Sequence, residues 1–352
     1  MSRTDTLNIF NKIFVLPIIS NIVASFKSNL FRDTIVIRGG INLKTYIFDP
    51  ISKEALAYAK TCLDVVCWDS PEINEYGSVE AVIVRTFKMT SAVIDQMPNL
   101  KIIAKHGVGV DNIDIPYATS KGIRVTNTPT ANMNSVAELI VGFALAGARR
   151  ITQSHIAALR GLEKNQPMYL SGYELAGKTL GLIGLGKIGA SAGKKLRDAF
   201  EMKVIVFDPY ATEEHCNFLG FTKIQSIDEV CKNGDIISIS VPLTKETENM
   251  IGSRELSLMK ETAILINTAR GGIVNEDDLY EALKSRKIFG AALDVFAQEP
   301  VSKDHPLLTC DNFIATPHNG ANTEDALIRM GTGAVDEIIR MKNGEKPLAN
   351  VS

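Results

Sequence analysis

The 352-residue sequence has few of the features that mark a metalloprotein or a disulfide-stabilised secreted protein. Its five cysteines are scattered and never stand in CxxC spacing, which is typical of reduced core thiols in a reducing compartment. The five histidines are equally dispersed, so the sequence predicts no metal site. These absences favour a cytoplasmic protein without disulfides or bound metal.

An excess of charge of one sign is also missing. The 38 basic residues nearly balance the 40 acidic ones, and no run of Lys or Arg stands out. Such a protein has no net field to attract nucleic acid or an anionic membrane, so neither is expected as a partner. Any anionic ligand must therefore be bound by local groups.

Residues 1–43 contain no uninterrupted apolar run that could cross a membrane, because Pro17 breaks them. Apolar residues from Ile19 to Leu30 recur at helical spacing, which predicts a short amphipathic helix. A targeting segment would be poorer in acids, and Asp5 and Asp33 count against one. We therefore favour an extension that packs on its own domain or on a partner subunit, with a targeting segment as the alternative.

From residue 44 onwards, short apolar runs alternate with helical stretches, which predicts α/β units built on parallel sheets. Strands are expected at 46–48, 65–68, 81–84, 102–105 and 123–125 in a first unit, and at 179–183, 204–208, 236–240, 263–267, 291–294 and 313–315 in a second. A long helix at 135–149 is expected to close the first unit. The amphipathic helix at 327–341 is expected to return to it. The predicted domains are an extension at 1–43, a discontinuous domain at 44–150 and 319–352, and a second domain at 151–318.

The sequence GLGKIG at 184–189 follows the apolar run 179–183 and opens a helical stretch, as in a dinucleotide-binding turn. Gly184 allows a tight turn, Gly186 lets backbone N–H groups approach a pyrophosphate, and Gly189 lets the helix lie close to the strand. Asp208 ends the next strand at about the spacing of ~20 residues expected for a carboxylate that binds an adenosine ribose. No Lys or Arg stands at 209–211 to hold a 2′-phosphate, so the pattern predicts NAD rather than NADP.

Polar residues that follow strands are the candidates for chemistry, because ligands of an open α/β sheet bind at the carboxyl ends of its strands. Arg270, Glu299 and His318 each follow a predicted strand of the second unit. Reduction of a carbonyl by a nicotinamide needs a cation that orients the substrate and a proton donor, which suit Arg and His. The Glu299 carboxylate would orient the imidazole and favour its protonated form. Each residue has a purely structural alternative, and His106 is a rival acid without a carboxylate placed like Glu299.

Six stretches of the chain resemble the D-isomer-specific 2-hydroxyacid dehydrogenase family, and the resemblance extends from about residue 45 to 351. They are HGVGVDNID (106–114), NSVAELIVG (134–142), GLIGLGKIG (181–189), NTARGG (267–272), ALDVFAQEP (292–300) and TPHNGA (316–321). The resemblance implies a doubly wound Rossmann NAD-binding domain and a discontinuous, flavodoxin-like α/β substrate-binding domain. It also implies a cleft between them that closes, and a homodimer as the smallest common assembly, with a tetramer as a further possibility.

The same resemblance assigns roles to individual residues. It implies that Arg270 binds the substrate carboxylate and keto oxygen, that His318 is the acid/base and that Glu299 is its partner. Cofactor contacts are implied or expected at Val108, Gly184, Gly186, Lys187, Ile188, Gly189, Asp208, Val241, Thr268, Ala269, Arg270, Asp294, His318 and Gly320, with Asp294 at the carboxamide. Substrate contacts are expected at Arg85, Lys105, Gly107, Val108, Gly109, Arg149 and Arg270.

Within the family, the chain is most similar to the 3-phosphoglycerate dehydrogenases of serine synthesis, on the stretches 83–86 and 147–150. Arg85, Lys105 and Arg149 could supply the local cations that a substrate phosphate needs. Arg149 also suits a helix C-terminus, and Arg85 could pair with an acid. The alternative enzyme is a glyoxylate or hydroxypyruvate reductase. An NAD(H)-sensing corepressor-like protein is disfavoured, because related corepressors have Trp where Asn319 stands.

Overall fold

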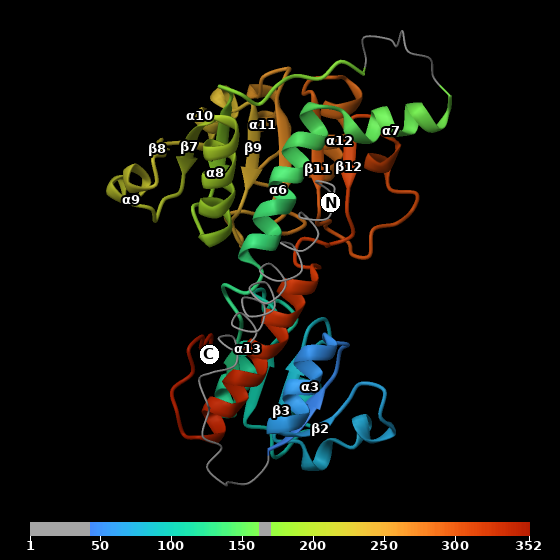
Figure 1. Cartoon of the computed structure of the whole chain (residues 1–352), viewed down its shortest axis with the longest axis vertical. Helices are drawn as coiled ribbons and strands as arrows, with labels where there is room; N and C mark the ends of the chain where they lie inside the picture. The colour runs from blue at the N-terminus through green and yellow to red at the C-terminus, as the bar shows by residue number, and fades with distance from the viewer. Residues whose placement is uncertain (1–42, 162–169) are drawn as a thin grey trace, which may run out of the picture. The chain divides into compact units, whose positions relative to one another are not determined.

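The computed structural model describes residues 43–161 and 170–352 (Figure 1). The helix predicted from Ile19 to Leu30 lies outside the described residues. Residues 43–352 pack as one unit that contains two parallel sheets.

The first sheet has five strands in the order β2-β1-β3-β4-β5, and all its neighbours are parallel. Its strands are β1 (Lys44–Ile47), β2 (Asp64–Val66), β3 (Ala81–Val84), β4 (Ile102–Lys105) and β5 (Arg124–Thr126). Helices α3 (Lys53–Cys62), α4 (Ser91–Ile94) and α5 (Ile115–Ser120) connect them. This strand order is that of the flavodoxin fold, and all five strands were expected from the sequence.

The second sheet has seven parallel strands in the order β12-β11-β10-β9-β6-β7-β8. They are β6 (Thr179–Ile183), β7 (Lys203–Phe207), β8 (Thr222–Lys223), β9 (Ile236–Ile239), β10 (Ile264–Asn267), β11 (Gly290–Leu293) and β12 (Phe313–Ala315). Its helices are α7 (Ile151–Leu159), α8 (Lys187–Phe200), α9 (Glu213–Phe218), α10 (Ile227–Asn233), α11 (Ser253–Leu258) and α12 (Glu276–Lys284). Strand order reverses between β6 and β9, as in a Rossmann fold, so the predicted doubly wound α/β class is confirmed. The two-residue strand β8 was not predicted.

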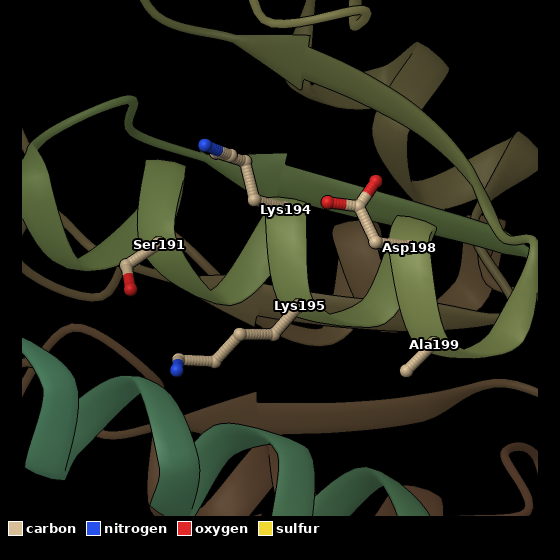
Figure 2. A pocket seen from close by; sticks show the side chains of 5 residues that line it. All are labelled: Ser191, Lys194, Lys195, Asp198 and Ala199. Carbon is tan, nitrogen blue, oxygen red and sulfur yellow. The ribbon is translucent and has the colours of Figure 1, made fainter.

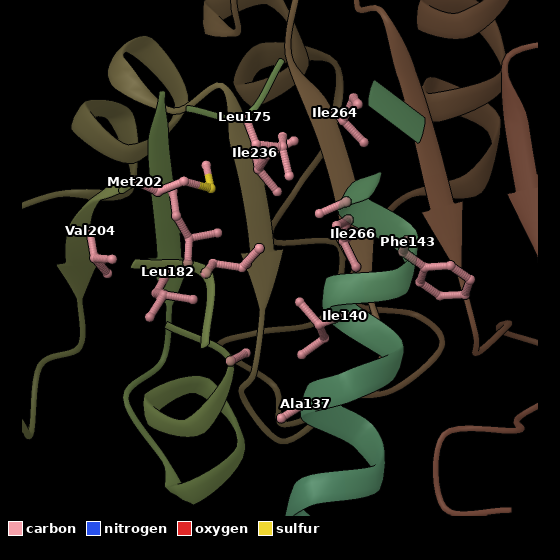
Figure 3. Close-up of a cluster of buried hydrophobic side chains, with 14 of the residues drawn as sticks. Ala137, Ile140, Phe143, Leu175, Leu182, Met202, Val204, Ile236, Ile264 and Ile266 are labelled. Atoms are coloured by element: carbon pink, nitrogen blue, oxygen red, sulfur yellow. The ribbon is translucent and has the colours of Figure 1, made fainter. Parts of the chain in front are cut away.

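The long helix α6 (Met133–Ala148) does not close the first unit, as the sequence led us to expect. It packs on α8 and on β10 and β11 of the seven-stranded sheet. Ala137, Ile140 and Phe143 on this helix join the same buried cluster as Ile264 and Ile266 (Figure 3). The helix packs on the second sheet because its apolar face is buried there.

The last helix, α13 (Glu324–Lys342), packs on α3 and β4 of the five-stranded sheet. Thr323 caps its N-terminus by accepting from the N–H of Ala326, and Arg340 and Lys342 stand in its last turn, where cations favour the helix dipole. Its buried residues Ala334 and Ile338 belong to the same apolar cluster as β1 and β3. Helix α13, although distant in sequence, thus lies beside α3 on the five-stranded sheet.

The interior strands of both sheets are buried on both faces. β3, β9, β10 and β11 contain only buried residues, which is why they read as continuous apolar runs rather than alternating ones. Polar side chains are consequently concentrated in the loops beyond the strand ends, where the site is built.

Candidate active site

The predicted dinucleotide-binding turn lies at the point where strand order reverses. Gly184 has φ of +95°, and a Cβ there would lie 2.5 Å from the carbonyl oxygen of Ser240, which follows the neighbouring strand β9. Gly189 lies so close to the turn that a Cβ would be 2.6 Å from the Gly184 carbonyl oxygen. Both positions therefore require glycine, one for its conformation and both for the close approach of backbone.

Gly186 and the first turn of α8 fit a phosphate group. A Cβ on Gly186 would meet no atom within 4 Å among the described residues, so the backbone here is open to a ligand. Gly186 is the N-cap of α8, and no side chain of the described structure caps this helix. The N–H groups of Lys187 and Ile188 thus remain available at the positive end of the helix dipole.

Asp208 stands directly after β7 and holds the glycine turn. Its Oδ2 accepts from the N–H of Leu185 at 2.7 Å, and its Oδ1 accepts from the N–H of Tyr210 at 2.8 Å. Val241, another predicted contact, lies against Gly184 across the switch point. The carboxylate is thus fixed beside the turn, with Tyr210 largely exposed beyond it.

The three residues with predicted chemistry follow adjacent strands. Asn267, Leu293 and Ala315 are in register across β10, β11 and β12, so Arg270, Glu299 and His318 extend from one edge of the sheet. The Asn267 side chain organises the first of these turns, because it accepts from the N–H of Ala269 and donates to the Arg270 carbonyl.

His318 and Glu299 form a hydrogen-bonded pair. His318 Nδ1 lies 2.8 Å from Glu299 Oε2, and the other carboxylate oxygen accepts from the N–H of Phe296 at 3.1 Å. The His318 side chain is 52% exposed, and because Glu299 takes Nδ1, the other ring nitrogen has no partner among the described residues. The pairing predicted from the sequence is therefore present in the geometry.

The turn that carries His318 is held by Asp294, which is 1% exposed. The Asp294 carboxylate accepts from the hydroxyl of Thr316 and from the N–H groups of Asn319 and Gly320, and its carbonyl accepts from the N–H of His318. His318 itself adopts φ of +52°, a left-handed conformation that these bonds stabilise. Asp294 was predicted at the cofactor carboxamide, and in the structure its carboxylate binds this turn.

Arg270 reaches from the end of β10 to the loop after β4 of the first sheet. Its Nε donates to Asp111 Oδ2 at 3.0 Å and its Nη1 to the carbonyl of Ala269 at 2.6 Å. The guanidinium lies on Gly109, where a Cβ would be 1.8 Å from Nη2. Because the Asp111 side chain is 68% exposed, this ion pair is weak, and a substrate carboxylate can compete for the guanidinium.

Asp49 positions the loop that carries Arg85, a role that sequence reasoning missed. Its Oδ2 accepts from the N–H groups of Arg85, Thr86 and Phe87, and its Oδ1 accepts from the Thr86 hydroxyl. Burial alone would raise the pKa of Asp49, but these hydrogen bonds outweigh it and lower the pKa. The available signal was an acid directly after the first predicted strand.

Lys105 is buried, and internal acceptors hold its ammonium group. Nζ donates to the carbonyl of Arg85 at 2.6 Å and to Asn112 Oδ1 at 2.5 Å. Burial lowers the pKa of Lys105 to about 8, against the opposing field of Asp111 and Asp49. No described residue gives the guanidinium of Arg85 a hydrogen bond or an ion pair. Arg85 is therefore the more available of the two cations.

Within a single chain, Arg149 does not lie near Arg85 and Lys105, contrary to the expectation from the sequence. Arg149 is the C-cap of α6, and this end of the helix contacts Ile264 at the start of β10. At the other end of α6, the hydroxyl of Ser135 donates to the carbonyl of Gly320, which follows His318. The helix spans roughly 24 Å at 1.5 Å per residue, so Arg149 lies at the opposite edge of the sheet.

Other predicted residues lie where the loops meet the sheets. Thr268 and Ala269 precede Arg270 in the turn after β10. Val108 lies in the loop after β4, and its carbonyl accepts from the side chain of Asn127, which directly follows β5. Gly107 donates its N–H to the Thr128 hydroxyl. These contacts fix the backbone of both loops.

His106, the rival acid, is 2% exposed and lies against Gly331 of α13. Burial lowers its pKa to about 4, and the charge of Arg85 adds to the effect. A histidine that is neutral at physiological pH and shielded from solvent is poorly suited to give a proton to a substrate. The structure therefore supports His318 over His106.

A separate hollow lies on α8, lined by Ser191, Lys194, Lys195, Asp198 and Ala199 (Figure 2). Lys195 points toward α6, where its Nζ lies 3.4 Å from Glu138. The lining residues are on the outer part of the helix, beyond the glycine turn, so this hollow is not the predicted site.

Neither a metal-binding cluster nor a helix that could span a bilayer occurs in the part of the chain that the structure describes. A glycine turn at the switch point of a Rossmann sheet, with an uncapped helix behind it, defines a dinucleotide-binding domain.

Comparisons with known proteins agree with this class. Residues 141–320 match the family described as D-isomer specific 2-hydroxyacid dehydrogenase, NAD binding domain. A D-3-phosphoglycerate dehydrogenase of Methanocaldococcus jannaschii is 43% identical over 308 residues, which are 86% of this chain and 58% of that protein. A glyoxylate reductase of Thermofilum pendens is 39% identical over 320 residues, 88% of this chain and 94% of that protein. The crystal structure of the TT0316 protein from Thermus thermophilus superposes with a TM-score of 0.80 at 33% identity, covering 88% of this chain and all of that one.

The chain thus belongs to the D-isomer-specific 2-hydroxyacid dehydrogenase family, and residues 141–320 form its NAD(P)-binding domain. It spans 58% of the length of the archaeal phosphoglycerate dehydrogenases that it matches.

Proposed function

We propose that this protein is an NAD-dependent dehydrogenase that interconverts a D-2-hydroxy acid and its 2-keto acid. The observation that carries the proposal is the His318–Glu299 pair, with 2.8 Å between Nδ1 and Oε2, on the strand-end edge that also presents Arg270. A proton donor and a cation at the same edge are what reduction of a 2-keto acid requires.

In this proposal each side chain has a defined task. Arg270 binds the substrate carboxylate and polarises the keto oxygen, replacing its weak contact with Asp111. His318 gives a proton to the keto oxygen in reduction and takes it back in oxidation. Glu299 holds the imidazole through Nδ1, so the opposite nitrogen faces the substrate.

The cofactor would be held by the glycine turn and the first turn of α8. N–H groups of Lys187 and Ile188 would bind the pyrophosphate, and Asp208 would accept from the adenosine ribose. When bound, the nicotinamide supplies or accepts the hydride. NAD is preferred to NADP because residues 209–211 provide no cation for a 2′-phosphate.

We propose 3-phosphoglycerate as the substrate, in serine synthesis. Arg85 supports this choice, because its guanidinium has no partner among the described residues and its charge, like that of Arg270, acts on Lys105. The phosphate would bind there while its carboxylate binds Arg270. The proposal includes two working domains whose cleft closes on the substrate, a homodimer or a tetramer, and a cytoplasmic location.

A second candidate is reduction of hydroxypyruvate or glyoxylate. It is favoured by the internal hydrogen bonds of Lys105, which occupy one of the predicted phosphate cations, and by the position of Arg149 far from the site.

The test is a panel of cofactor-linked assays with purified protein. NADH formation from 3-phosphoglycerate and NAD is measured beside NADH consumption with hydroxypyruvate, glyoxylate and 2-ketoglutarate. Turnover confined to 3-phosphoglycerate supports the first substrate, and turnover of only the small keto acids supports the second. NADH-dependent capture of a protein partner without turnover of any acid would instead favour a corepressor-like sensor.

A further inference from the structure

A second histidine–glutamate pair lies behind the loop that carries Glu299. His305 Nε2 is 3.0 Å from Glu276 Oε2, and both side chains are largely buried, at 22% and 15% exposure. Glu276 is the first residue of α12, and His305 stands before a short 3-10 helix. None of the tasks described above uses either residue.

The Glu276 carboxylate binds the backbone of the loop that carries Glu299. Its Oε1 accepts from the N–H of Ala297 at 2.6 Å, while the preceding N–H, of Phe296, donates to Glu299 Oε1. Two consecutive peptide N–H groups therefore bind two different carboxylates. The two peptides share the Cα of Phe296, so we expect displacement of the Ala297 N–H to move the Phe296 N–H and to change the support of Glu299.

His305 contacts the same loop through the ring of Phe296. Its ring lies edge-on to Phe296, with 5.6 Å between centroids, and Phe296 is 4% exposed. Its Nδ1 accepts from the N–H of Leu307, which leaves Nε2 to carry the proton that binds Glu276. The neutral imidazole thus satisfies both of its neighbours and fixes the Glu276 carboxylate in place.

We propose that Glu276 and His305 are positioning residues that fix Glu299 against His318. Residues 297–300 are exposed, so the loop has little packing of its own beyond Phe296. The Glu276 carboxylate is bonded at both oxygens, to His305 and to the N–H of Ala297. It therefore holds the loop in the position that keeps Glu299 within hydrogen-bond distance of His318. This inference rests on the proposed function, because it assigns the pair a role in the proposed proton transfer.

The test compares Glu276→Ala with Asp278→Ala as the matched control. Asp278 belongs to the same first turn of α12, but its carboxylate accepts from the N–H of Ser253 and not from the loop. Glu276→Ala is expected to lower kcat roughly 10-fold while KM for NADH stays within about twofold, since only the acid is displaced. Asp278→Ala is expected to change neither.

A double variant separates positioning from general weakening of the structure. If Glu276 acts through Glu299, then Glu276→Ala combined with Glu299→Gln has the kcat of Glu299→Gln alone. Losses that multiply overturn the proposal. His305→Asn, which retains an acceptor for Leu307 but not the bond to Glu276, carries the same test if Glu276→Ala does not fold.

A readout that needs no turnover separates this inference from the proposed function. The ring C–H signals of His318 are recorded by NMR in the full chain and assigned with His318→Asn. They are expected to shift in Glu276→Ala and to match the wild type in Asp278→Ala. Unchanged His318 signals in Glu276→Ala overturn the positioning role, whereas shifted signals in a protein inactive on every acid overturn only the proposed function.

Discussion

The backbone of Gly271 lies directly against the backbone of Phe296: a Cβ on Gly271 would be 1.9 Å from the Phe296 carbonyl oxygen and 2.5 Å from the N of Ala297. Gly271 follows Arg270, and Phe296 begins the loop that carries Glu299. The close approach therefore sets how far Arg270, the proposed substrate-binding cation, stands from the partner of the proposed acid.

Gly271→Ala is expected to separate these two loops, because backbone atoms cannot rotate away from the added methyl group. We expect kcat/KM to fall about 100-fold, the effect of a displacement of about 1 Å at a reacting centre. Steady-state kinetics on the best substrate of the panel measures it. Gly142→Ala, in an open position on α6, serves as the control and should retain activity and melt no lower than wild type. Equal activity of Gly271→Ala and Gly142→Ala would contradict the expectation.

His318→Asn tests the proposed acid without disturbing its backbone, because Asn tolerates the left-handed conformation found at φ of +52°. We expect kcat to fall by about 10²–10⁴ with the melting temperature unchanged, since proton transfer is lost and the turn is retained. Glu299→Gln should cost less, because the amide can still bond the ring. A His318→Asn variant that keeps most of its activity would assign the proton donor elsewhere.

The strands and the glycine turn could be predicted because each depends on local sequence. Buried strands such as β9 and β10 read as apolar runs, and Gly184 precedes a backbone turn that few other residues adopt. The strand-end rule then placed Arg270, Glu299 and His318 on one edge without any knowledge of tertiary contacts.

What could not be predicted depends on contacts between distant segments. The periodicity of α6 reveals an apolar face but not which sheet covers it, so the sequence does not show that Arg149 lies far from Arg85 and Lys105. The support of Arg85 by Asp49 and the contact of Arg270 with Asp111 join residues 36 and 159 positions apart. No local pattern marks such pairs.

Lys105→Met tests the electrostatic cost of the buried ammonium group. Burial lowers the pKa of Lys105 to about 8 in the folded protein, whereas an unfolded chain has about 10.4. Between these values the unfolded state binds more protons, so the free energy of unfolding rises with pH, and below about pH 8 the full cost is present. The stability of wild type relative to Lys105→Met should therefore increase by up to about 3 kcal/mol across this window in urea titrations. A difference that is flat with pH would show that the ammonium group is not penalised by burial.

Arg85→Ala distinguishes the two substrate classes. If Arg85 binds a phosphate, loss of its charge-assisted hydrogen bonds should raise KM for 3-phosphoglycerate about 10-fold or more and leave KM for glyoxylate unchanged. Lys88→Ala removes a neighbouring charge from the exposed part of the same loop and is the control for a general field effect. Equal changes in both variants would remove Arg85 from the site. Equal effects of Arg85→Ala on both substrates would instead contradict a phosphate contact, since such a contact cannot affect an acid that has no phosphate.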